Sequence, residues 1–235
     1  MNPKNEVERI KQVYRGYREE GRQSLWRLEN PGNAMIYRER QQTLHALLDE
    51  AGFLPLAHCK VLEIGCGSGG VLATLLEWGA QPENLYGVDL LLDRIDEART
   101  RYPGMHFECA NAERLPYEDQ TFDLVLFFTV FSSILDQSMR QNVARESLRV
   151  LKKTGAILWY DFRYNNPANP NVRGMTKAEI RRLFPNAQMT LRTITLLPPL
   201  ARRLGKATPW LYPVLSKVSF LRSHYAGLIY KNASI

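Results

Sequence analysis

The chain has 235 residues, of which 45% are hydrophobic and 23% are charged. This composition is typical of a globular protein and excludes a disordered or fibrous one, and the length favours a single domain. The longest apolar run, LVLFFTVF at residues 124–131, is too short to span a bilayer. Neither export nor a membrane span is therefore expected.

The net charge of +7 is unevenly distributed along the chain. No Asp or Glu follows Glu179, whereas nine Lys and Arg side chains do, so residues 1–179 carry a net charge of −2. Attraction to anionic lipid, nucleic acid or substrate is therefore expected only in the C-terminal quarter.

Three cysteines, Cys59, Cys66 and Cys109, make an odd number without the paired spacing of metal ligands. This favours small buried side chains in a reducing cytoplasm over a disulfide framework or a metal site.

Two amphipathic helices are predicted before residue 60. The first ends near Gly21 and carries apolar side chains at helical spacing, namely Val7, Ile10, Val13 and Tyr17. The turn-rich stretch 29–33 separates it from a second helix with one apolar stripe, formed by Leu44, Leu47, Leu48 and Ala51.

From residue 60 onward, strand and helix patterns alternate. Strands are predicted at 60–65, 84–90, 105–110, 122–128 and 155–162, with helices at 70–79, 91–102 and 138–153. Continuously apolar strands separated by amphipathic helices indicate a parallel sheet that is covered on both faces.

The rest of the chain predicts a short helix that begins after Thr176 and ends before Pro185, a sixth strand at 187–197 and a seventh at 224–231. Between these strands, residues 198–223 are apolar and basic with four prolines, which indicates short broken helices. We expect one α/β domain with a helical cap (1–55), a cofactor-binding core (56–197), a lid insert (198–223) and a last strand (224–235).

The stretch VLEIGCGSGG at residues 61–70 places glycines at the junction between the first core strand and its helix. Such a turn lets backbone approach a ligand, and the free N–H groups of the helix favour an anionic group. Gly65, Gly67 and Gly70 also match a dinucleotide-binding pattern. Asp89 ends the next strand, where a carboxylate can accept both ribose hydroxyl hydrogens, so an adenosine-containing ligand is expected.

Three segments in order resemble the class I S-adenosylmethionine-dependent methyltransferases, particularly small-molecule enzymes such as the ubiquinone and menaquinone methylases. The first is E-x-G-x-G-x-G at Glu63, Gly65, Gly67 and Gly69. The second is the pattern formed by Ala112, Leu115, Pro116, Tyr117, Phe122 and Asp123, and the third is RVLKKTGAILWYD at 149–161.

This resemblance covers about residues 60–161 and implies a Rossmann-like, doubly wound sheet of seven strands, mostly parallel, with the last strand antiparallel. It implies S-adenosylmethionine as cofactor and a binding site made of Glu63, Gly65, Cys66, Gly67, Gly69, Asp89, Leu90, Asn111 and Ala112. Gly65 and Gly67 would pass the methionine part, Asp89 would hold the ribose and Leu90 would face the adenine. Asn111 stands where the family usually has Asp, and its carbonyl oxygen can still accept the adenine amino hydrogen.

Methyl transfer from a sulfonium is an in-line displacement that positioning alone can accelerate, so no catalytic residue is obligatory. If a hydroxyl is methylated, a base helps, and the candidates are Asp161 at the end of the fifth strand and His224 at the start of the seventh. The expected acceptor is a small molecule, with oxygen as the favoured atom and a lipid or glycan precursor as the favoured class.

The insert leaves the sixth strand at the carboxyl edge of the sheet and is therefore expected to border the active site. Its apolar and basic residues suit either a lid that completes the core or a peripheral contact with an anionic membrane, such as the inner face of the cytoplasmic membrane.

Three other functions remain open from the sequence. Nucleic-acid methylation fits the positive charge but lacks its usual motifs, because the fourth strand runs into FFTVFSSILD. An NAD-dependent oxidoreductase would need a Tyr-Lys pair at helical spacing, which is not found, and a non-catalytic binding protein could keep the same fold.

Overall fold

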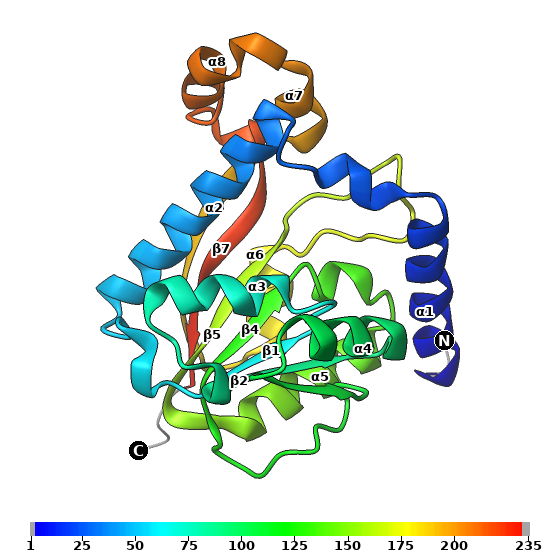
Figure 1. Cartoon of the computed structure of the whole chain (residues 1–235), viewed down its shortest axis with the longest axis vertical. Helices are drawn as coiled ribbons and strands as arrows, with labels where there is room; N and C mark the ends of the chain where they lie inside the picture. Colours follow the sequence, from blue (N-terminus) through cyan, green and yellow to red (C-terminus); the bar gives the residue numbers. More distant parts are fainter. Residues whose placement is uncertain (1–2, 232–235) are drawn as a thin grey trace.

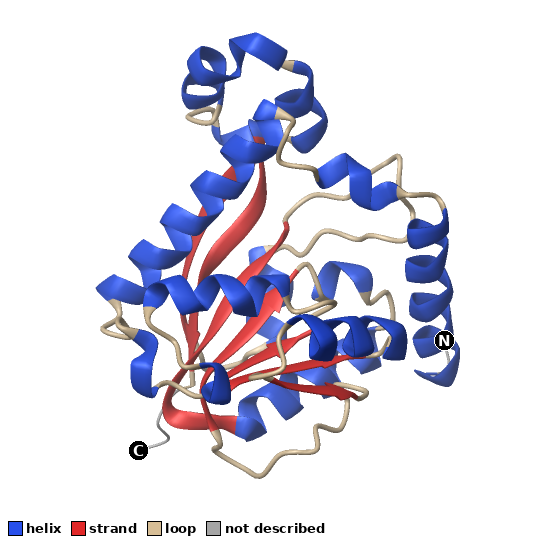
Figure 2. Cartoon of the chain, in the orientation of Figure 1, coloured by secondary structure: helices blue, strands red, loops and turns tan. Residues whose placement is uncertain are grey.

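The computed structural model describes residues 3–231. Its seven strands form one sheet in the order β3-β2-β1-β4-β5-β7-β6 (Figure 2). β7 runs antiparallel to its neighbours β5 and β6, and the other pairings are parallel. The strands are β1 Val61–Ile64, β2 Leu85–Asp89, β3 His106–Cys109, β4 Phe122–Phe128, β5 Leu151–Phe162, β6 Gln188–Leu196 and β7 Arg222–Tyr230. The predicted fold class is confirmed.

Helices cover both faces of the sheet, because alternate residues of the buried strands point to opposite sides. On one face, Leu62 of β1 and Trp159 of β5 pack in a core with α5 (Gln137–Val150) and α6 (Lys177–Leu183). On the other face, Val61 and Leu158 pack with α2 (Pro31–Glu50), α3 (Gly70–Thr74) and α4 (Leu92–Arg101). Burial of these two cores positions the carboxyl ends of the strands at one edge.

The two N-terminal helices form as predicted, but the second begins earlier than the turn-rich stretch 29–33 suggested. α1 spans Pro3–Glu19, and Gly21 follows in the left-handed conformation. α2 begins at Pro31 because the Asn30 side chain caps it, accepting hydrogen bonds from the Gly32 and Asn33 N–H groups. α1 stands beside the sheet and α2 runs along it (Figure 1).

Two predicted helices are shorter than their patterns indicated. The segment 70–79 divides into α3 and a 3-10 turn, η3 (Leu75–Trp78), which ends at the left-handed Gly79. The helix expected at 138–153 ends at Val150, and residues 151–154 begin β5 instead. Phe122 of β4 pairs with Leu151, so sheet pairing outweighs the helical pattern there.

The insert between β6 and β7 consists of short helices, as predicted: α7 (Pro198–Arg203), η6 (Gly205–Ala207), α8 (Thr208–Leu215) and η7 (Ser219–Leu221). It packs on the N-terminal end of α2 at the top of Figure 1. β7 begins at Arg222, two residues before the expected boundary, and residues 232–235 of the expected last strand lie outside the described part of the chain. The remaining short turns are η1 (Arg22–Trp26), η2 (Leu56–His58), η4 (Pro82–Asn84) and η5 (Phe131–Ser133).

Candidate active site

The loop between β1 and α3 turns on two glycines in the left-handed conformation. Gly65 has φ +75° and Gly67 has φ +53°, a region that side chains rarely adopt. A Cβ atom on Gly65 would lie 2.8 Å from Val130 Cγ2, so only backbone fits there. The Gly65 and Cys66 N–H groups both donate to the Val88 carbonyl, at 2.8 and 3.0 Å, and this fixes the loop beside the end of β2.

Two other residues of the glycine stretch serve packing. Gly69 has φ +81°, and a Cβ atom on it would lie 2.8 Å from Phe107 Cζ. Cys66 is buried with its Sγ against Gly87, and burial raises the pKa of its thiol. Neither Cys66 nor Gly69 lines the pocket described below. The cofactor contacts expected for these two residues therefore stay predictions.

Asp89, the last residue of β2, holds the glycine loop in place. Its Oδ2 accepts a hydrogen bond from the Gly67 N–H, and its Oδ1 accepts one from the Leu91 N–H, both at 2.9 Å. Each carboxylate oxygen keeps a further lone pair, and Asp89 lines the pocket. The carboxylate is therefore fixed in orientation and can still accept two hydroxyl donors.

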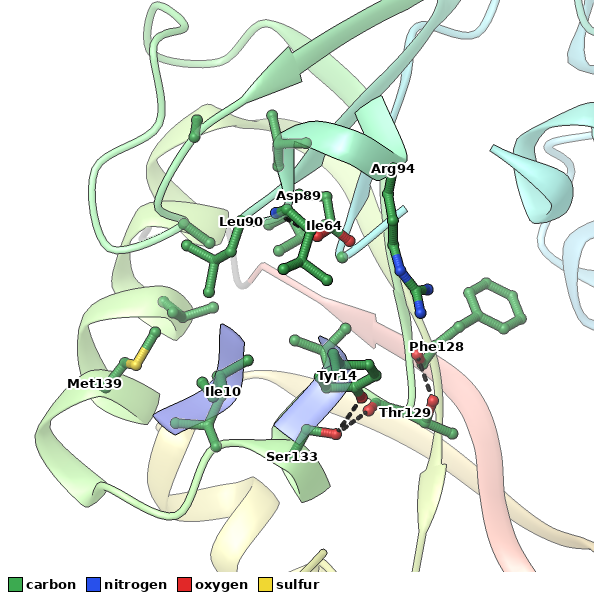
Figure 3. A pocket seen from close by; sticks show the side chains of 18 residues that line it. Ile10, Tyr14, Ile64, Asp89, Leu90, Arg94, Phe128, Thr129, Ser133 and Met139 are labelled. Carbon is green, nitrogen blue, oxygen red and sulfur yellow. Dashed lines mark hydrogen bonds between the residues drawn. The ribbon is translucent and has the colours of Figure 1, made fainter. Parts of the chain in front are cut away.

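A pocket of about 870 Å³, counted with its mouth, lies at the carboxyl ends of β1, β2 and β4 (Figure 3). Leu90 and Met139 lie on one side of the view, and Arg94 and Phe128 on the other. The sheet therefore places the predicted cofactor residues Gly65, Asp89, Leu90 and Ala112 around one cavity.

Asn111 does not line this pocket, although Ala110 and Ala112 on either side of it do. Its Oδ1 accepts a hydrogen bond from the Glu113 N–H at 3.0 Å, and its Nδ2 donates to Glu113 Oε2 at 3.1 Å. The side chain thus shapes the turn after β3. An adenine contact through its second lone pair stays a prediction.

Glu63 is buried near the glycine loop, where the positive charge of Arg40 acts on it. Glu63 is 1% exposed, and neither its Oε2 nor the Arg40 Nε has a hydrogen-bond partner among residues 3–231. Burial raises the pKa of Glu63 well above its usual value, an effect that the Arg40 charge partly offsets. The Arg40 guanidinium carbon lies 5.7 Å from the centre of the Phe128 ring, which lines the pocket. Unpaired buried polar atoms are costly, but neither residue lines the pocket, so the cofactor contact expected for Glu63 stays a prediction.

α1 closes the pocket, as expected for an N-terminal cap, with Ile10 and Tyr14 in its lining. The Tyr14 Oη lies 2.8 Å from Ser133 Oγ, which in turn donates to the Thr129 carbonyl at 3.0 Å. Because Ser133 has one hydroxyl hydrogen, Tyr14 is the donor of the first bond. Thr129 has φ +56°, a strained conformation for a β-branched residue and one that is typical of functional sites.

Sequence reasoning missed Tyr14, Arg40, Arg94 and Ser133 as site residues. Tyr14 lies in the first helix, where the pattern indicates only packing, and Arg40 lies in a polar helical stretch that carries no motif. Only the proximity of Ser133 to the end of β4 gave a signal, since ligands lie beyond the carboxyl ends of parallel strands.

The two candidate bases lie on strands outside the pocket: Asp161 is on β5, next to β4, and His224 is on β7, one strand further away. Asp161 is fully buried, its oxygens accept the Ser132 and Phe162 N–H groups at 3.0 and 2.7 Å, and burial raises its pKa to about 6. His224 stacks on Tyr160 at 4.5 Å, and burial lowers its pKa to about 3. Neither side chain lines the pocket, so their catalytic roles stay predictions.

The insert at residues 198–223 does not contribute to the pocket lining either. It lies at the expected carboxyl edge, but it packs on α2 and away from α1, which forms the cover. Within residues 3–231, no three His, Cys, Asp or Glu side chains gather as they would around a metal ion. None of the helices in that range has the length and apolarity that crossing a bilayer requires.

Comparison with known proteins identifies the central segment. The family model of a methyltransferase domain matches residues 61–155. The phthiotriol/phenolphthiotriol dimycocerosates methyltransferase of Mycobacterium tuberculosis is 38% identical over 109 residues, which are 46% of this chain and 39% of that protein. The ubiquinone/menaquinone biosynthesis C-methyltransferase of Bartonella tribocorum is 31% identical over 113 residues, 46% of this chain and 42% of that protein. The chain thus spans about two fifths of the length of these curated relatives.

Among solved structures, the 1,6-didemethyltoxoflavin-N1-methyltransferase of Burkholderia thailandensis, which holds S-adenosylhomocysteine, superposes with a TM-score of 0.65. The match covers 99% of this chain and 91% of that one at 16% identity, and so it shows a common fold. The fold, the glycine loop and the match of residues 61–155 to the methyltransferase-domain model support a class I S-adenosylmethionine-dependent methyltransferase, in agreement with the resemblance in the sequence. S-adenosylmethionine is the cofactor of this class, as predicted.

Proposed function

We propose that the chain transfers the methyl group of S-adenosylmethionine to a hydroxyl oxygen of a small hydrophobic molecule, such as a lipid-linked or glycan precursor. The observation that carries this proposal is the Asp89 carboxylate, which is fixed to the glycine loop and lines the pocket. Near that loop, the buried Glu63 Oε2 and Arg40 Nε atoms have no hydrogen-bond partner among residues 3–231. A carboxylate suits the ribose hydroxyls of this cofactor, and an acid and a guanidinium suit the ammonium and the carboxylate of its methionine part.

Different residues would bind different parts of the cofactor. Asp89 would accept the ribose hydroxyls, and Leu90 and Ala112 would contact the adenine. Glu63 and Arg40 would meet the ammonium and the carboxylate. When bound, S-adenosylmethionine supplies a methyl group that is activated by the positive charge on its sulfur.

At the acceptor end, Tyr14 positions the substrate. Its hydrogen is donated to Ser133, so a lone pair of the Tyr14 oxygen stays available to accept a hydrogen bond from an incoming hydroxyl. Burial raises the pKa of Tyr14, so the phenol stays neutral and orients the hydroxyl without removing its proton. As the bond between carbon and the acceptor oxygen forms and the bond between carbon and sulfur breaks, the sulfonium would become a neutral thioether and the hydroxyl proton would pass to solvent. Alignment of this kind can account for much of the rate of an in-line transfer.

Apolar side chains surround this end of the pocket and favour a hydrophobic acceptor. They come from α1, from the segment after β4 and from α5, namely Ile10, Val130, Ile134, Met139 and Val143. They would also exclude water from the reacting atoms. The names of the relatives, a dimycocerosate methyltransferase and a quinone C-methyltransferase, support an acceptor of this class.

Isothermal titration calorimetry tests the proposal. S-adenosylmethionine and S-adenosylhomocysteine should bind with one site per chain, and NAD should not bind. Gly67→Arg should abolish binding because it fills the loop at a left-handed position. Gly21→Arg is the matched control, since Gly21 is also left-handed but has open space around it. NAD binding, or equal losses in both variants, would contradict the proposal.

A further inference from the structure

Exposed apolar side chains concentrate at one end of the molecule. Ten large hydrophobic residues are exposed in the described part of the chain, and seven of them lie in two segments. The first segment, residues 22–29, contributes Leu25, Trp26 and Leu28, and the second, the insert 198–223, contributes Trp210, Leu211, Val214 and Phe220. Such a cluster on a globular protein marks an interaction surface.

The two segments form one continuous surface, because Asn33 at the start of α2 joins them. Its Nδ2 donates to the Leu25 and Arg27 carbonyls, both at 2.8 Å, and its Oδ1 accepts from Arg202 Nε at 3.1 Å. The Arg202 guanidinium also lies 4.3 Å from the centre of the Trp26 ring. In Figure 1 the insert lies above the N-terminal end of α2, and η1 of the first segment lies to the right of that end, between α1 and α2.

α8 presents its apolar side chains outward because its opposite face is anchored. Tyr212 is 2% exposed, and its hydroxyl donates to Glu39 Oε2 of α2 at 2.6 Å. Trp210 and Val214 are four residues apart, so they share one face of the helix, and they are 78% and 61% exposed. Their exposure is thus imposed by the anchor and is not a result of loose packing.

The positive charge of this surface favours a partner with negative charge. The two segments carry seven cations, Arg22, Arg27, Arg202, Arg203, Lys206, Lys217 and Arg222, and a single acid, Glu29. Exposed aromatic and aliphatic side chains flanked by Lys and Arg are the combination that binds the interface of an anionic bilayer. We propose that residues 22–29 and 198–223 form one docking surface for an anionic membrane.

The surface also has a consequence for the acceptor, which rests on the proposed function. The insert begins where β6 ends and returns where β7 starts, at the carboxyl edge of the sheet that also holds the pocket. Docking would therefore hold the pocket close to the bilayer from which a lipid-linked acceptor would come.

Co-sedimentation of the full chain with vesicles tests the inference. Vesicles of equal parts phosphatidylglycerol and phosphatidylcholine should bind the protein, whereas pure phosphatidylcholine should not, and binding should weaken as salt rises. Arg203→Gln with Lys206→Gln should weaken binding roughly 30-fold, as expected for two cations near such a surface. Trp26→Ser and Trp210→Ser should each weaken it, since both segments take part.

Matched controls lie elsewhere on the molecule. Lys153→Gln removes an exposed cation and Leu76→Ser an exposed apolar side chain outside the surface, and both should bind like the wild type. Absence of vesicle binding, or a dimer in sedimentation velocity that Trp210→Ser dissociates, would overturn the inference. S-adenosylhomocysteine titration in the same samples separates the proposals, because the docking variants should keep full cofactor affinity.

Discussion

The Asp89 carboxylate accepts a hydrogen bond from the Gly67 N–H at 2.9 Å, so the acid at the end of β2 and the glycine loop after β1 form one rigid unit. Asp89→Ala should weaken S-adenosylhomocysteine binding on the order of 100-fold, because two hydrogen bonds to a charged group are lost. Asp96→Ala removes an exposed acid of the next helix, α4, and should leave the affinity for S-adenosylhomocysteine unchanged. Equal affinities in calorimetry for Asp89→Ala and the wild type would refute the ribose assignment.

The glycine loop permits a test that separates strain from ligand contact. Gly67→Ala and Gly21→Ala should each cost about 1–2 kcal/mol of unfolding free energy, because both residues are left-handed. Only Gly67→Ala should also weaken cofactor binding, since its methyl group would lie 3.3 Å from an Arg94 nitrogen that lines the pocket. Chemical denaturation and calorimetry on both variants give the comparison, and a loss of affinity in Gly21→Ala would count against a local effect.

Glu63 predicts a pH dependence of cofactor binding. Its pKa is raised well above the usual value by burial, so the free protein holds the carboxyl protonated at a pH where an exposed Glu is ionised. Contact with the ammonium of the methionine part needs the ionised form, so affinity should rise with pH up to the raised pKa and then level off. Glu63→Gln should flatten this profile in titrations from pH 5 to 8. A slope that persists in the variant would assign the effect to another group.

His224 predicts an acid sensitivity of the fold. Its folded pKa of about 3 lies below the unfolded value, so the unfolded state binds the proton first and stability falls as pH drops below about 6.5. Between pH 7.5 and 5.0 this amounts to about 2 kcal/mol. In urea denaturation, the unfolding free energy of His224→Gln should fall by about 2 kcal/mol less than that of the wild type when the pH is lowered from 7.5 to 5.0. The raised pKa of Asp161 acts in the opposite sense and cancels in the comparison.

Tyr14 should affect methyl transfer without affecting cofactor affinity. Tyr14→Phe removes the hydroxyl that bonds Ser133, so S-adenosylhomocysteine should bind as before while turnover with an acceptor alcohol falls about tenfold or more. Tyr17→Phe removes a hydroxyl of the same helix that bonds Asn169 instead and is the control. Equal turnover in the two variants would remove Tyr14 from the acceptor site.

The sequence predicted most of the sheet because its strands are continuously apolar and its glycine loop has a specific spacing. It placed Gly65, Asp89, Leu90 and Ala112 together, since each follows a strand whose carboxyl end must meet the others at one edge. The ends of two helices, those predicted at 70–79 and 138–153, were wrong. The boundary at Val150 depends on pairing between Phe122 and Leu151, which no local pattern records.

The rest of the site depends on contacts between distant segments. Tyr14 meets Ser133 across 119 residues, and Arg40 approaches Glu63 only when α2 packs on the sheet. Helical periodicity identifies the buried face of α1 and α2 but not the surface that this face covers. The sequence suggested a membrane contact for the insert. It did not indicate that residues 22–29 contribute to the same surface, because that depends on contacts between segments far apart in the chain.

A crystal structure of the chain with S-adenosylhomocysteine is the decisive experiment for the cofactor site. Both ribose hydroxyls should lie within hydrogen-bond distance of Asp89, and the ammonium and carboxylate should lie beside Glu63 and Arg40. A cofactor bound elsewhere, or a ribose that does not contact Asp89, would contradict this assignment.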